Sequence, residues 1–164
     1  MSQREANDTK HSFLILGANS FSGASFVRHL RKKNCTVIAT SRSKQPDHAF
    51  VPYLWDKNGQ DIIFERLDLN SEDDSLENIL DKYTPTHVVN FAAQSMVGES
   101  WLHPQAWMRT NVYSTVRLHE TLRNYKNLRK YVQVTTPEVY GSTEGWVSEH
   151  RNFNPSTPYA VSRA

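Results

Sequence analysis

Ser12-Phe13-Leu14-Ile15-Leu16-Gly17-Ala18-Asn19-Ser20-Phe21-Ser22-Gly23 is an apolar run that ends in a turn with two glycines. The run predicts a buried strand, and a helical pattern follows it, whose apolar side holds Phe21, Ala24, Phe26, Val27 and Leu30. A strand, a glycine turn and a helix open a dinucleotide-binding unit. Gly17 permits the tight turn, Gly23 lets helix and sheet pack closely, and the first helical amides then face a pyrophosphate.

The middle position of this G-x-x-G-x-x-G spacing is Ser20, which is small enough to allow close approach of a cofactor. An ordinary turn between strand and helix is the alternative interpretation. On the dinucleotide interpretation, the loop residues expected to bind the cofactor are Gly17, Asn19, Ser20, Phe21, Ser22 and Gly23.

Further apolar runs predict strands at residues 36–40, 62–64, 86–91 and 131–134. Helical patterns separate most of these runs, and the chain has no internal repeat. Strands that alternate with helices predict an α/β fold of the Rossmann type, a doubly wound parallel sheet of order 3-2-1-4-5. The carboxyl ends of such strands meet at one edge of the sheet, where ligands bind.

The composition indicates one domain, residues 1–164, with a polar surface. Of the 164 residues, 38% are hydrophobic and 22% are charged. A formal charge of +2 gives no reason to expect nucleic acid as a partner, and no apolar run is long enough to span a membrane. The single cysteine, Cys35, fits a reducing compartment, and the polar first residues do not resemble a signal peptide. We therefore expect a cytoplasmic protein.

The end of the second predicted strand bears on the choice of cofactor. An NAD-binding chain offers an acid there to the ribose 2′-hydroxyl. Here Ser41-Arg42-Ser43 follows, and the first acid is Asp47. A guanidinium between hydroxyls suits a 2′-phosphate, so Arg42 favours NADP over NAD, with a solvated loop arginine as the alternative. After the third strand, Asp68 with Leu69 is placed either to accept from the adenine amine or to cap a loop.

Three segments carry structural predictions. Ser71 is expected to begin a helix, with Asp74 three residues later in a capping-box-like arrangement. A long helix is expected from Pro104 through about Tyr125, and its buried stripe comprises Trp107, Val112, Val116 and Leu118. Residues 44–60 predict a long loop, in which Tyr53 and Trp55 cover the core.

Small residues follow the fourth strand in Ala92-Ala93-Gln94-Ser95, where a flat ring or a ribose could lie against the backbone. Asn111 lies among the apolar residues of the long helix, and a buried asparagine needs partners. It either bonds backbone near the site or is a satisfied core amide. The residues His87, His103, His119 and His150 show no metal-ligand spacing with Cys35, so no metal is expected.

The acid/base chemistry is expected after the fifth strand, in Thr135-Thr136-Pro137-Glu138-Val139-Tyr140-Gly141 and Pro158-Tyr159-Ala160-Val161-Ser162-Arg163. Thr157 predicts the N-cap of a helix that begins at Pro158. Tyr159 and Arg163 are four residues apart and share a face of it. A phenol ionises near pH ~10, and a nearby positive charge lowers such a pKa. Tyrosine, cation, hydroxyl and carboxylate together make a general acid/base site for a carbinol carbon. The alternative for the tyrosine and arginine is an exposed helical pair.

With these motifs, the chain resembles the extended short-chain dehydrogenase/reductase family, and within it the nucleotide-sugar 4,6-dehydratases that act on GDP-mannose or dTDP-glucose. The matching segments are Gly17 to Gly23, Asp68-Leu69, Asn90 to Ser95, Thr110-Asn111-Val112, Thr135 to Gly141 and Pro158 to Arg163. They correspond to about the first half of such an enzyme. The resemblance therefore implies that a substrate-binding part follows residue 164, that residues 1–164 alone turn nothing over, and that the full-length protein is a homodimer.

The resemblance also implies roles for single residues. Tyr159 takes the C4 hydroxyl proton of a nucleotide-diphospho-hexose while hydride passes from C4 to the nicotinamide, and Thr136 hydrogen-bonds the same oxygen. Glu138 then removes the C5 proton, water leaves from C6, and hydride returns to C6. The residues implied to contact the cofactor here are Ala92, Ala93, Gln94, Tyr159 and Arg163. Those implied to contact the substrate are Ser95, Asn111, Thr136 and Glu138.

This chain departs from the family pattern at Pro137, where the family has aspartate or serine, and at Arg163, where it has lysine. Glu138 favours a dehydratase, since the epimerases of the family carry a small or apolar residue there. A 4-epimerase or reductase, in which Glu138 only hydrogen-bonds the substrate, is one alternative. A dinucleotide-binding module without catalysis, such as a redox-sensing regulator, is another.

Overall fold

A computed structural model describes residues 11–33, 35–55 and 62–164, and within them a five-stranded parallel sheet of order β3-β2-β1-β4-β5. The strands are β1 (Ser12–Leu16), β2 (Thr36–Ser41), β3 (Ile62–Arg66), β4 (His87–Asn90) and β5 (Lys130–Gln133). Their order and direction confirm the predicted Rossmann-type sheet.

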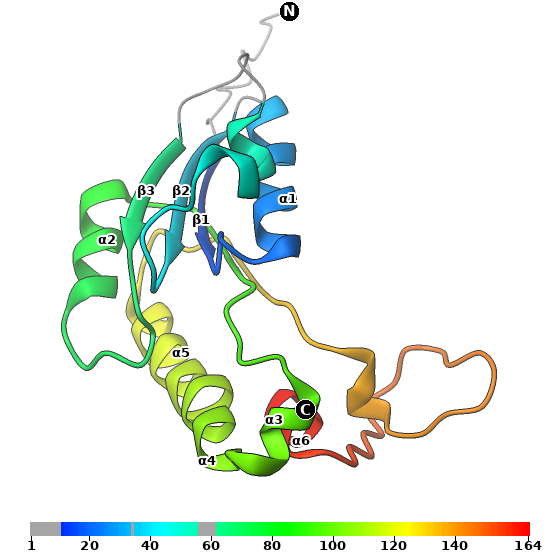
Figure 1. Ribbon diagram of the computed structural model, residues 1–164. Coiled ribbons are helices and arrows are strands. Elements are labelled where there is room, and N and C mark those ends of the chain that lie inside the picture. The colour runs from blue at the N-terminus through cyan, green and yellow to red at the C-terminus, as the bar shows by residue number, and fades with distance from the viewer. Residues whose placement is uncertain (1–10, 34, 56–61) are drawn as a thin grey trace, which may run out of the picture.

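Helices cover both faces of the sheet (Figure 1). Helix α1 (Phe21–Lys32) lies on one face, while α2 (Ser75–Tyr83) and α5 (Ser114–Asn124) lie on the other. The short helices α3 (Val97–Leu102), α4 (Pro104–Trp107) and α6 (Pro158–Arg163) gather beyond the carboxyl ends of the strands. The remaining helical segments are short: the 3₁₀ turns η1 (His48–Phe50), η2 (Pro52–Leu54) and η4 (Pro137–Tyr140), and the π-helical turn η3 (Met108–Tyr113).

The side chains of β1 alternate between two cores. Leu14 and Leu16 pack with α2 and α5, whereas Ile15 packs with α1, and all three are at most 1% exposed. Successive residues of a strand point to opposite faces, so a run that is apolar at every position is the signature of a strand buried on both sides. This is why the run before the glycine turn predicts the central strand of the sheet.

Helix α1 differs from its predicted apolar side at one position. Phe21 is 91% exposed, and the buried residues of the helix are Gly23, Ala24, Val27 and Leu30. The buried side of the first turn is occupied by Gly23, because that turn approaches the loop after β1 too closely for a side chain.

The helix after β3 begins later than predicted. It starts at Ser75, and its N-cap Asp74 accepts no capping bond through its side chain from the described backbone. Ser71 remains in the loop, where its carbonyl accepts a hydrogen bond from Arg117 Nη1 (2.6 Å). At the observed start of the helix, Asp73 Oδ1 accepts from the Ser75 N–H (3.1 Å), so the local contact forms later in the chain than predicted.

The predicted long helix from Pro104 to Tyr125 forms as three consecutive pieces, α4, η3 and α5, but its predicted buried stripe is partly wrong. Trp107 and Leu118 are buried, whereas Val112 is 42% and Val116 is 53% exposed. The inward positions between Trp107 and Leu118 are held by two polar residues, Asn111 and Ser114, which are 4% and 1% exposed. Both side chains make hydrogen bonds inside the molecule, which offsets the cost of their burial.

The segment after β2 contains η1 and η2, and residues 56–60 of the predicted loop lie outside the described residues. Tyr53 is fully buried against the α1 side of the sheet, as predicted. Trp55 is 49% exposed and covers the core less than predicted, with the guanidinium of Arg28 5.7 Å from its ring centroid.

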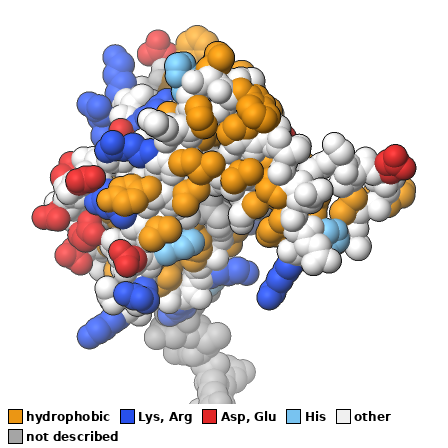
Figure 2. All heavy atoms as spheres, turned by 90° about the horizontal axis from the view of Figure 1, so that it is seen from below, with side chains coloured by type: hydrophobic (Ala, Val, Ile, Leu, Met, Phe, Trp, Pro, Cys, Tyr) orange, Lys and Arg blue, Asp and Glu red, His pale blue; other side chains and the backbone are white. Residues whose placement is uncertain are grey.

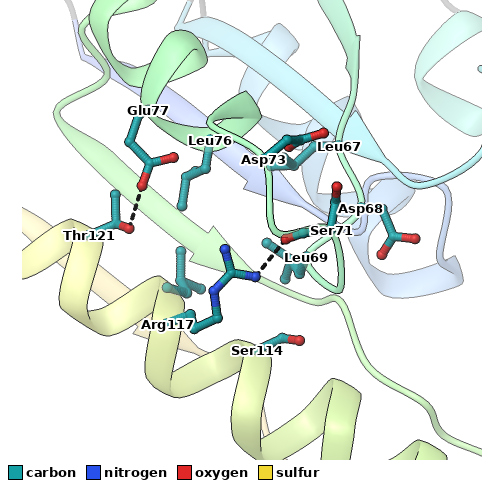
Figure 3. Close-up of a pocket in the computed structure, with 11 residues that line it drawn as sticks. Leu67, Asp68, Leu69, Ser71, Asp73, Leu76, Glu77, Ser114, Arg117 and Thr121 are labelled. Atoms are coloured by element: carbon teal, nitrogen blue, oxygen red, sulfur yellow. Dashed lines mark hydrogen bonds between the residues drawn. The ribbon is translucent and has the colours of Figure 1, made fainter.

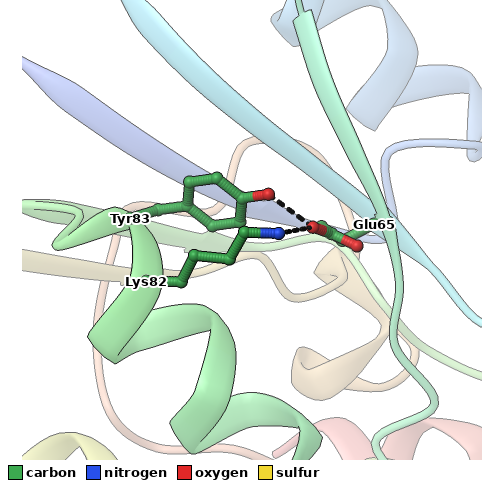
Figure 4. A network of polar contacts seen from close by, with 3 residues as sticks. All are labelled: Glu65, Lys82 and Tyr83. Atoms are coloured by element: carbon green, nitrogen blue, oxygen red, sulfur yellow. Dashed lines mark hydrogen bonds and ion pairs between the residues drawn. The ribbon is translucent and has the colours of Figure 1, made fainter.

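A polar cluster joins α2 to strand β3 (Figure 4). Glu65 accepts hydrogen bonds from the Tyr83 hydroxyl and from Lys82 Nζ, the latter at 3.0 Å. The hydrogen bond from Tyr83, and after it the one from Lys82, lowers the pKa of Glu65.

Within the described residues, no helix combines the length and the hydropathy that a bilayer crossing requires.

Candidate active site

A cavity of about 270 Å³ lies at the carboxyl edge of the sheet, between the loops that follow β1, β2, β3 and β4. It brings together many of the residues predicted to bind a cofactor: Gly17, Asn19, Ser20, Arg42, Asp68, Leu69, Ala92 and Ala93. The other residues predicted to bind the cofactor are not among its lining residues: Phe21, Ser22, Gly23, Gln94, Tyr159 and Arg163. Ser41 and Ser43, the hydroxyls predicted to flank Arg42, line it as well, whereas Leu16, Thr40, Leu67, Asn70, Phe91 and Thr110 were missed from the sequence.

The glycine turn makes the floor of this cavity. Gly17 has φ of +78°, a conformation that favours glycine, and a Cβ there would lie 2.6 Å from the backbone nitrogen of Ala92. The loops after β1 and β4 therefore touch backbone to backbone. A side chain at residue 17 would push these two loops apart and so change the floor of the cavity.

Ser20 has a structural role that its place in the glycine motif did not reveal. It is the N-cap of α1, and its Oγ accepts from the Gly23 N–H (3.1 Å) and donates to the Gly17 carbonyl (2.7 Å). The first turn of the helix carries no acidic residue. The positive end of the α1 dipole is therefore unopposed by a carboxylate of its own, which suits an anion such as a pyrophosphate.

The β2 loop is tied to the glycine turn through Asn19. Asn19 Nδ2 donates to Ser43 Oγ and to the Lys44 carbonyl, each at 3.1 Å. Asn19 Oδ1 is buried, with no hydrogen-bond partner among the described residues. Arg66 Nη2 donates to the Arg42 carbonyl (3.3 Å), while the Arg42 side chain is exposed at the cavity rim. A buried orphan acceptor beside a basic rim fits a ligand that brings both a hydroxyl donor and a negative charge.

The β3 loop forms the opposite wall and is braced from behind. Asp68 Oδ1 accepts from the Asn70 N–H (2.9 Å), and Asn70 also bonds Thr110 and Ser114 on the helix below. Behind this loop lies a small cavity of about 30 Å³ between α2 and α5 (Figure 3). There Arg117 donates to the Ser71 carbonyl, so α5 fixes the far end of the loop as well.

Across the same small cavity, Thr121 Oγ1 of α5 donates to Glu77 Oε1 of α2 (2.8 Å; Figure 3). Helices α2 and α5 are thereby joined directly. The loop that carries Asp68 and Leu69 is thus held between two linked helices, which keeps one wall of the larger cavity in place.

The residues predicted for chemistry lie on η4 and α6, which contact each other below the sheet. Thr136 is 8% exposed and is the N-cap of η4, and its Oγ1 accepts from the Glu138 N–H (3.3 Å). Pro137 is the first residue of that turn. Proline is favoured at such a position because the N–H it lacks would be unpaired there. Pro137, which departs from the family pattern, therefore has a structural role as the first residue of η4.

Helix α6 carries Tyr159 and Arg163, and its N-cap is Thr157, as predicted. Arg163 Nη2 donates to the Val134 carbonyl at the end of β5, and Thr135 Oγ1 donates to the Arg163 carbonyl (2.7 Å). Burial lowers the pKa of Arg163, and the neighbouring phenols of Tyr159 and then Tyr131 oppose that effect. The guanidinium is thus bonded to the end of β5 and interacts electrostatically with the Tyr159 and Tyr131 phenols.

Asn111 connects the β4 loop to α6. Its Oδ1 accepts from the Gln94 N–H (2.9 Å), and its Nδ2 donates to the Gln94 carbonyl (3.0 Å) and to Ser162 Oγ (2.9 Å). The sequence left two alternatives for Asn111, and the structure shows the first of them: its side chain bonds the backbone of Gln94 near the site. All three of these hydrogen bonds are to protein groups. Ser95, next to Gln94, is exposed.

Most of the cavity-lining residues that the sequence analysis missed could have been found from their position in the chain. Most of the missed lining residues directly adjoin predicted ones at the strand ends. The exceptions are Thr40, two positions before Arg42, and Thr110, which comes from the π-helical turn. A rule that takes every residue within two positions of a strand end would have found most of them.

Across residues 11–33, 35–55 and 62–164, no group of at least three His, Cys, Asp or Glu side chains could hold a metal ion.

The sequence model of one family, described as GDP-mannose 4,6 dehydratase, matches residues 14–164. Among solved structures, MoeE5 in complex with UDP-glucose and NAD is 30% identical, with a TM-score of 0.76 over 93% of this chain and 45% of that chain. The UDP-glucose 4-epimerase of Thermus thermophilus, in complex with NAD, is 25% identical, with a TM-score of 0.76, and 93% of this chain and 47% of that chain are covered. The UDP-Glc/GlcNAc 4-epimerase of Campylobacter jejuni is 22% identical, with a TM-score of 0.81 over 93% and 46% of the two chains. The chain spans less than half the length of each.

Proposed function

This chain belongs to the GDP-mannose 4,6-dehydratase family, among the nucleotide-sugar dehydratases and epimerases, and we propose that it forms the cofactor-binding and acid/base part of a nucleotide-sugar 4,6-dehydratase. Its substrate is a nucleotide-diphospho-hexose, and its product is a 4-keto-6-deoxy sugar. The match over residues 14–164 confirms the family predicted from the motifs. The dehydratase reaction itself is our proposal.

The observation that carries this proposal is the contact between η4, with Glu138, and α6, with Tyr159. A dehydratase needs two proton-transfer groups, one for the C4 hydroxyl and one for C5. Tyr159 serves the first, with Thr136 as the hydrogen-bond donor to the same oxygen, and Glu138 serves the second. Glu138 is half-buried, so it is partly withdrawn from water yet open on one side.

The cofactor proposed for the cavity is NADP, or else NAD. When bound, the nicotinamide supplies a reversible hydride acceptor. The glycine turn and the N-terminus of α1 fit its pyrophosphate, and the orphan Asn19 Oδ1 fits a ribose hydroxyl. The exposed guanidinium of Arg42, with Ser43 beside it, fits a 2′-phosphate.

The choice of NADP has its own test. Arg42→Ala should weaken NADP binding about 10- to 100-fold and leave NAD binding nearly unchanged, because only NADP carries the charge that the guanidinium pairs with. Fluorescence titration with the two reduced cofactors measures both. An equal loss for both cofactors would show that Arg42 does not read the 2′-phosphate.

A 4-epimerase is the second candidate. Two of the solved structures compared are described as 4-epimerases, although at 22% and 25% identity their likeness rests chiefly on the fold. Pro137 also favours this candidate, because it supplies no acid for the C6 hydroxyl. In an epimerase the C6 hydroxyl is retained and Glu138 only contacts the substrate.

The mass of the product separates the two candidates. With NADP and a panel of nucleotide hexoses, the full-length protein should release a product that has lost one water, whereas an isomer of unchanged mass identifies an epimerase. Glu138→Gln should slow the loss of water about 10²- to 10⁴-fold, the usual contribution of a general base. Glu144→Gln is the matched control, since Glu144 is exposed in the loop after η4 and should change nothing.

A homodimer is also part of the proposal. Hydrophobic side chains gather on the end of the molecule where the short helices lie (Figure 2). On the adjoining helical segments η3 and α5, Val112, Tyr113 and Val116 are each 42–53% exposed. A second copy of the protein that packs helix against helix would cover them. Sedimentation of the wild type and of a Val116→Lys variant tests this.

A further inference from the structure

Helix α6 has only six residues, and the N–H groups of its first turn have no partner inside the helix. Thr157 Oγ1 accepts from the Ala160 N–H (3.0 Å). The Tyr159 N–H is satisfied from elsewhere, because it donates to Ser100 Oγ (3.2 Å) on α3. Ser100 is fully buried, and its hydroxyl donates in turn to the Val97 carbonyl (2.6 Å). One hydroxyl thus links the backbone of Tyr159 to the backbone of α3.

The carbonyl of Tyr159 is held as well. Ser162 Oγ donates to it (2.7 Å) and accepts from Asn111 Nδ2 (2.9 Å). A serine that bonds back within its own helix is a common local contact. The bond from Asn111 is not local, since the two residues are 51 positions apart, and Ser162 is only 5% exposed.

We propose that Ser100 is a positioning residue for the catalytic tyrosine, and that Ser100 and Ser162 together hold the two backbone polar groups of Tyr159. The inference rests on the acid/base role proposed above for Tyr159. The direction in which a side chain leaves the backbone follows from the backbone atoms of its own residue. Ser100 controls the N–H side of Tyr159 and Ser162 the carbonyl side, so together they set where the phenol points.

The length of α6 explains why such anchors are needed. A helix of so few residues is marginal by itself, and its first turn frays without tertiary bonds. Displacement of a catalytic group by about 1 Å costs on the order of 10²-fold in rate. Two buried hydroxyls, each tied to a separate element of the fold, prevent that displacement.

Ser100→Ala in the full-length enzyme is the test. It should lower kcat about 10- to 100-fold and change the affinity for NADP by less than about threefold, because the cofactor cavity is lined by other residues. Ser162→Ala should act in the same direction. The matched control is Thr86→Val, which also removes a hydroxyl that contacts one backbone N–H and one carbonyl, both of Ser12, at the opposite end of the sheet, and that contacts His87 Nδ1 as well (2.8 Å). It should lower the melting temperature without lowering kcat.

A double variant separates positioning from general stability. If Ser100 acts through the phenol, Ser100→Ala should cause no further loss in a Tyr159→Phe background. An equal loss in both backgrounds would overturn the inference, and so would a kcat for Ser100→Ala that matches the Thr86→Val control. If Ser100→Ala does not fold, the same comparison with Ser162→Ala decides. Full activity of Tyr159→Phe by itself would instead refute the proposed function.

Discussion

Replacement of Gly23 by alanine tests the close contact between α1 and the turn after β1. A Cβ at residue 23 would lie 2.4 Å from the carbonyl oxygen of Gly17 and 2.8 Å from Ser20 Oγ. The nearer atom belongs to the backbone, so it cannot turn aside as the end of a flexible side chain can. Overpacking of this kind costs about 1–3 kcal/mol.

Two smaller effects of this substitution oppose each other. Gly23 lies in the first turn of α1, and alanine is favoured over glycine in a helix by about 1 kcal/mol. A displaced turn also loses the bond from the Gly23 N–H to Ser20 Oγ (3.1 Å), and such a cap contributes about 1 kcal/mol. Since these terms cancel, Gly23→Ala should lower the free energy of unfolding by about 1–3 kcal/mol.

Gly98 provides a matched control for this prediction. It lies in the first turn of α3, and apart from its chain neighbours and the backbone of its own helix no described atom comes within 4 Å of the place where its Cβ would be. Gly98→Ala should therefore raise the free energy of unfolding by up to about 1 kcal/mol. Urea unfolding followed by circular dichroism measures both variants, and NADPH titration should show weaker binding for Gly23→Ala alone. If Gly23→Ala unfolds at the same or a higher urea concentration than the wild type, the reasoning is wrong.

Two further predictions concern stability. Leu118→Ala should cost about 2–5 kcal/mol and Val147→Ala less than about 0.5 kcal/mol, because the first side chain is 1% and the second 41% exposed. Equal losses in urea unfolding would contradict the burial of these two residues. The pKa of Glu65 is lowered by hydrogen bonds from Tyr83 and then Lys82, so its charged form stabilises the fold at neutral pH. That contribution should disappear as the pH falls through the range in which glutamate protonates. The difference in melting temperature between wild type and Glu65→Gln should then shrink, and a constant difference would refute this.

The strand pattern and the turn chemistry made the sheet predictable from the sequence. The apolar run before Gly17 alternates between two cores, and this double burial identifies a central strand without knowledge of its neighbours. The caps at Ser20 and Thr157 are also local, since each accepts from an N–H three residues ahead. Thr157 was predicted in that role, whereas Ser20 was read only as a substitute for glycine.

Some predictions from the sequence were wrong because they treated a local pattern as sufficient. Ser71 has the spacing of a capping box, but Arg117 holds its carbonyl in the loop, 46 residues away in sequence. Val112 and Val116 are apolar and yet exposed, because the inward positions of that helix are taken by Asn111 and Ser114. Hydrophobicity alone does not set the buried side of a helix when polar residues there find hydrogen-bond partners.

The sequence by itself determined which segments are strands, the place of the glycine turn and the presence of a tyrosine and a glutamate beyond the last strand. The reason is that strand burial, turns and caps depend on residues close together in the chain. Only the tertiary structure decided which groups hold Tyr159, since Ser100 is 59 positions away and no local spacing connects the two. Such a bond depends on how separate elements pack against one another, and that packing is a property of the folded chain as a whole.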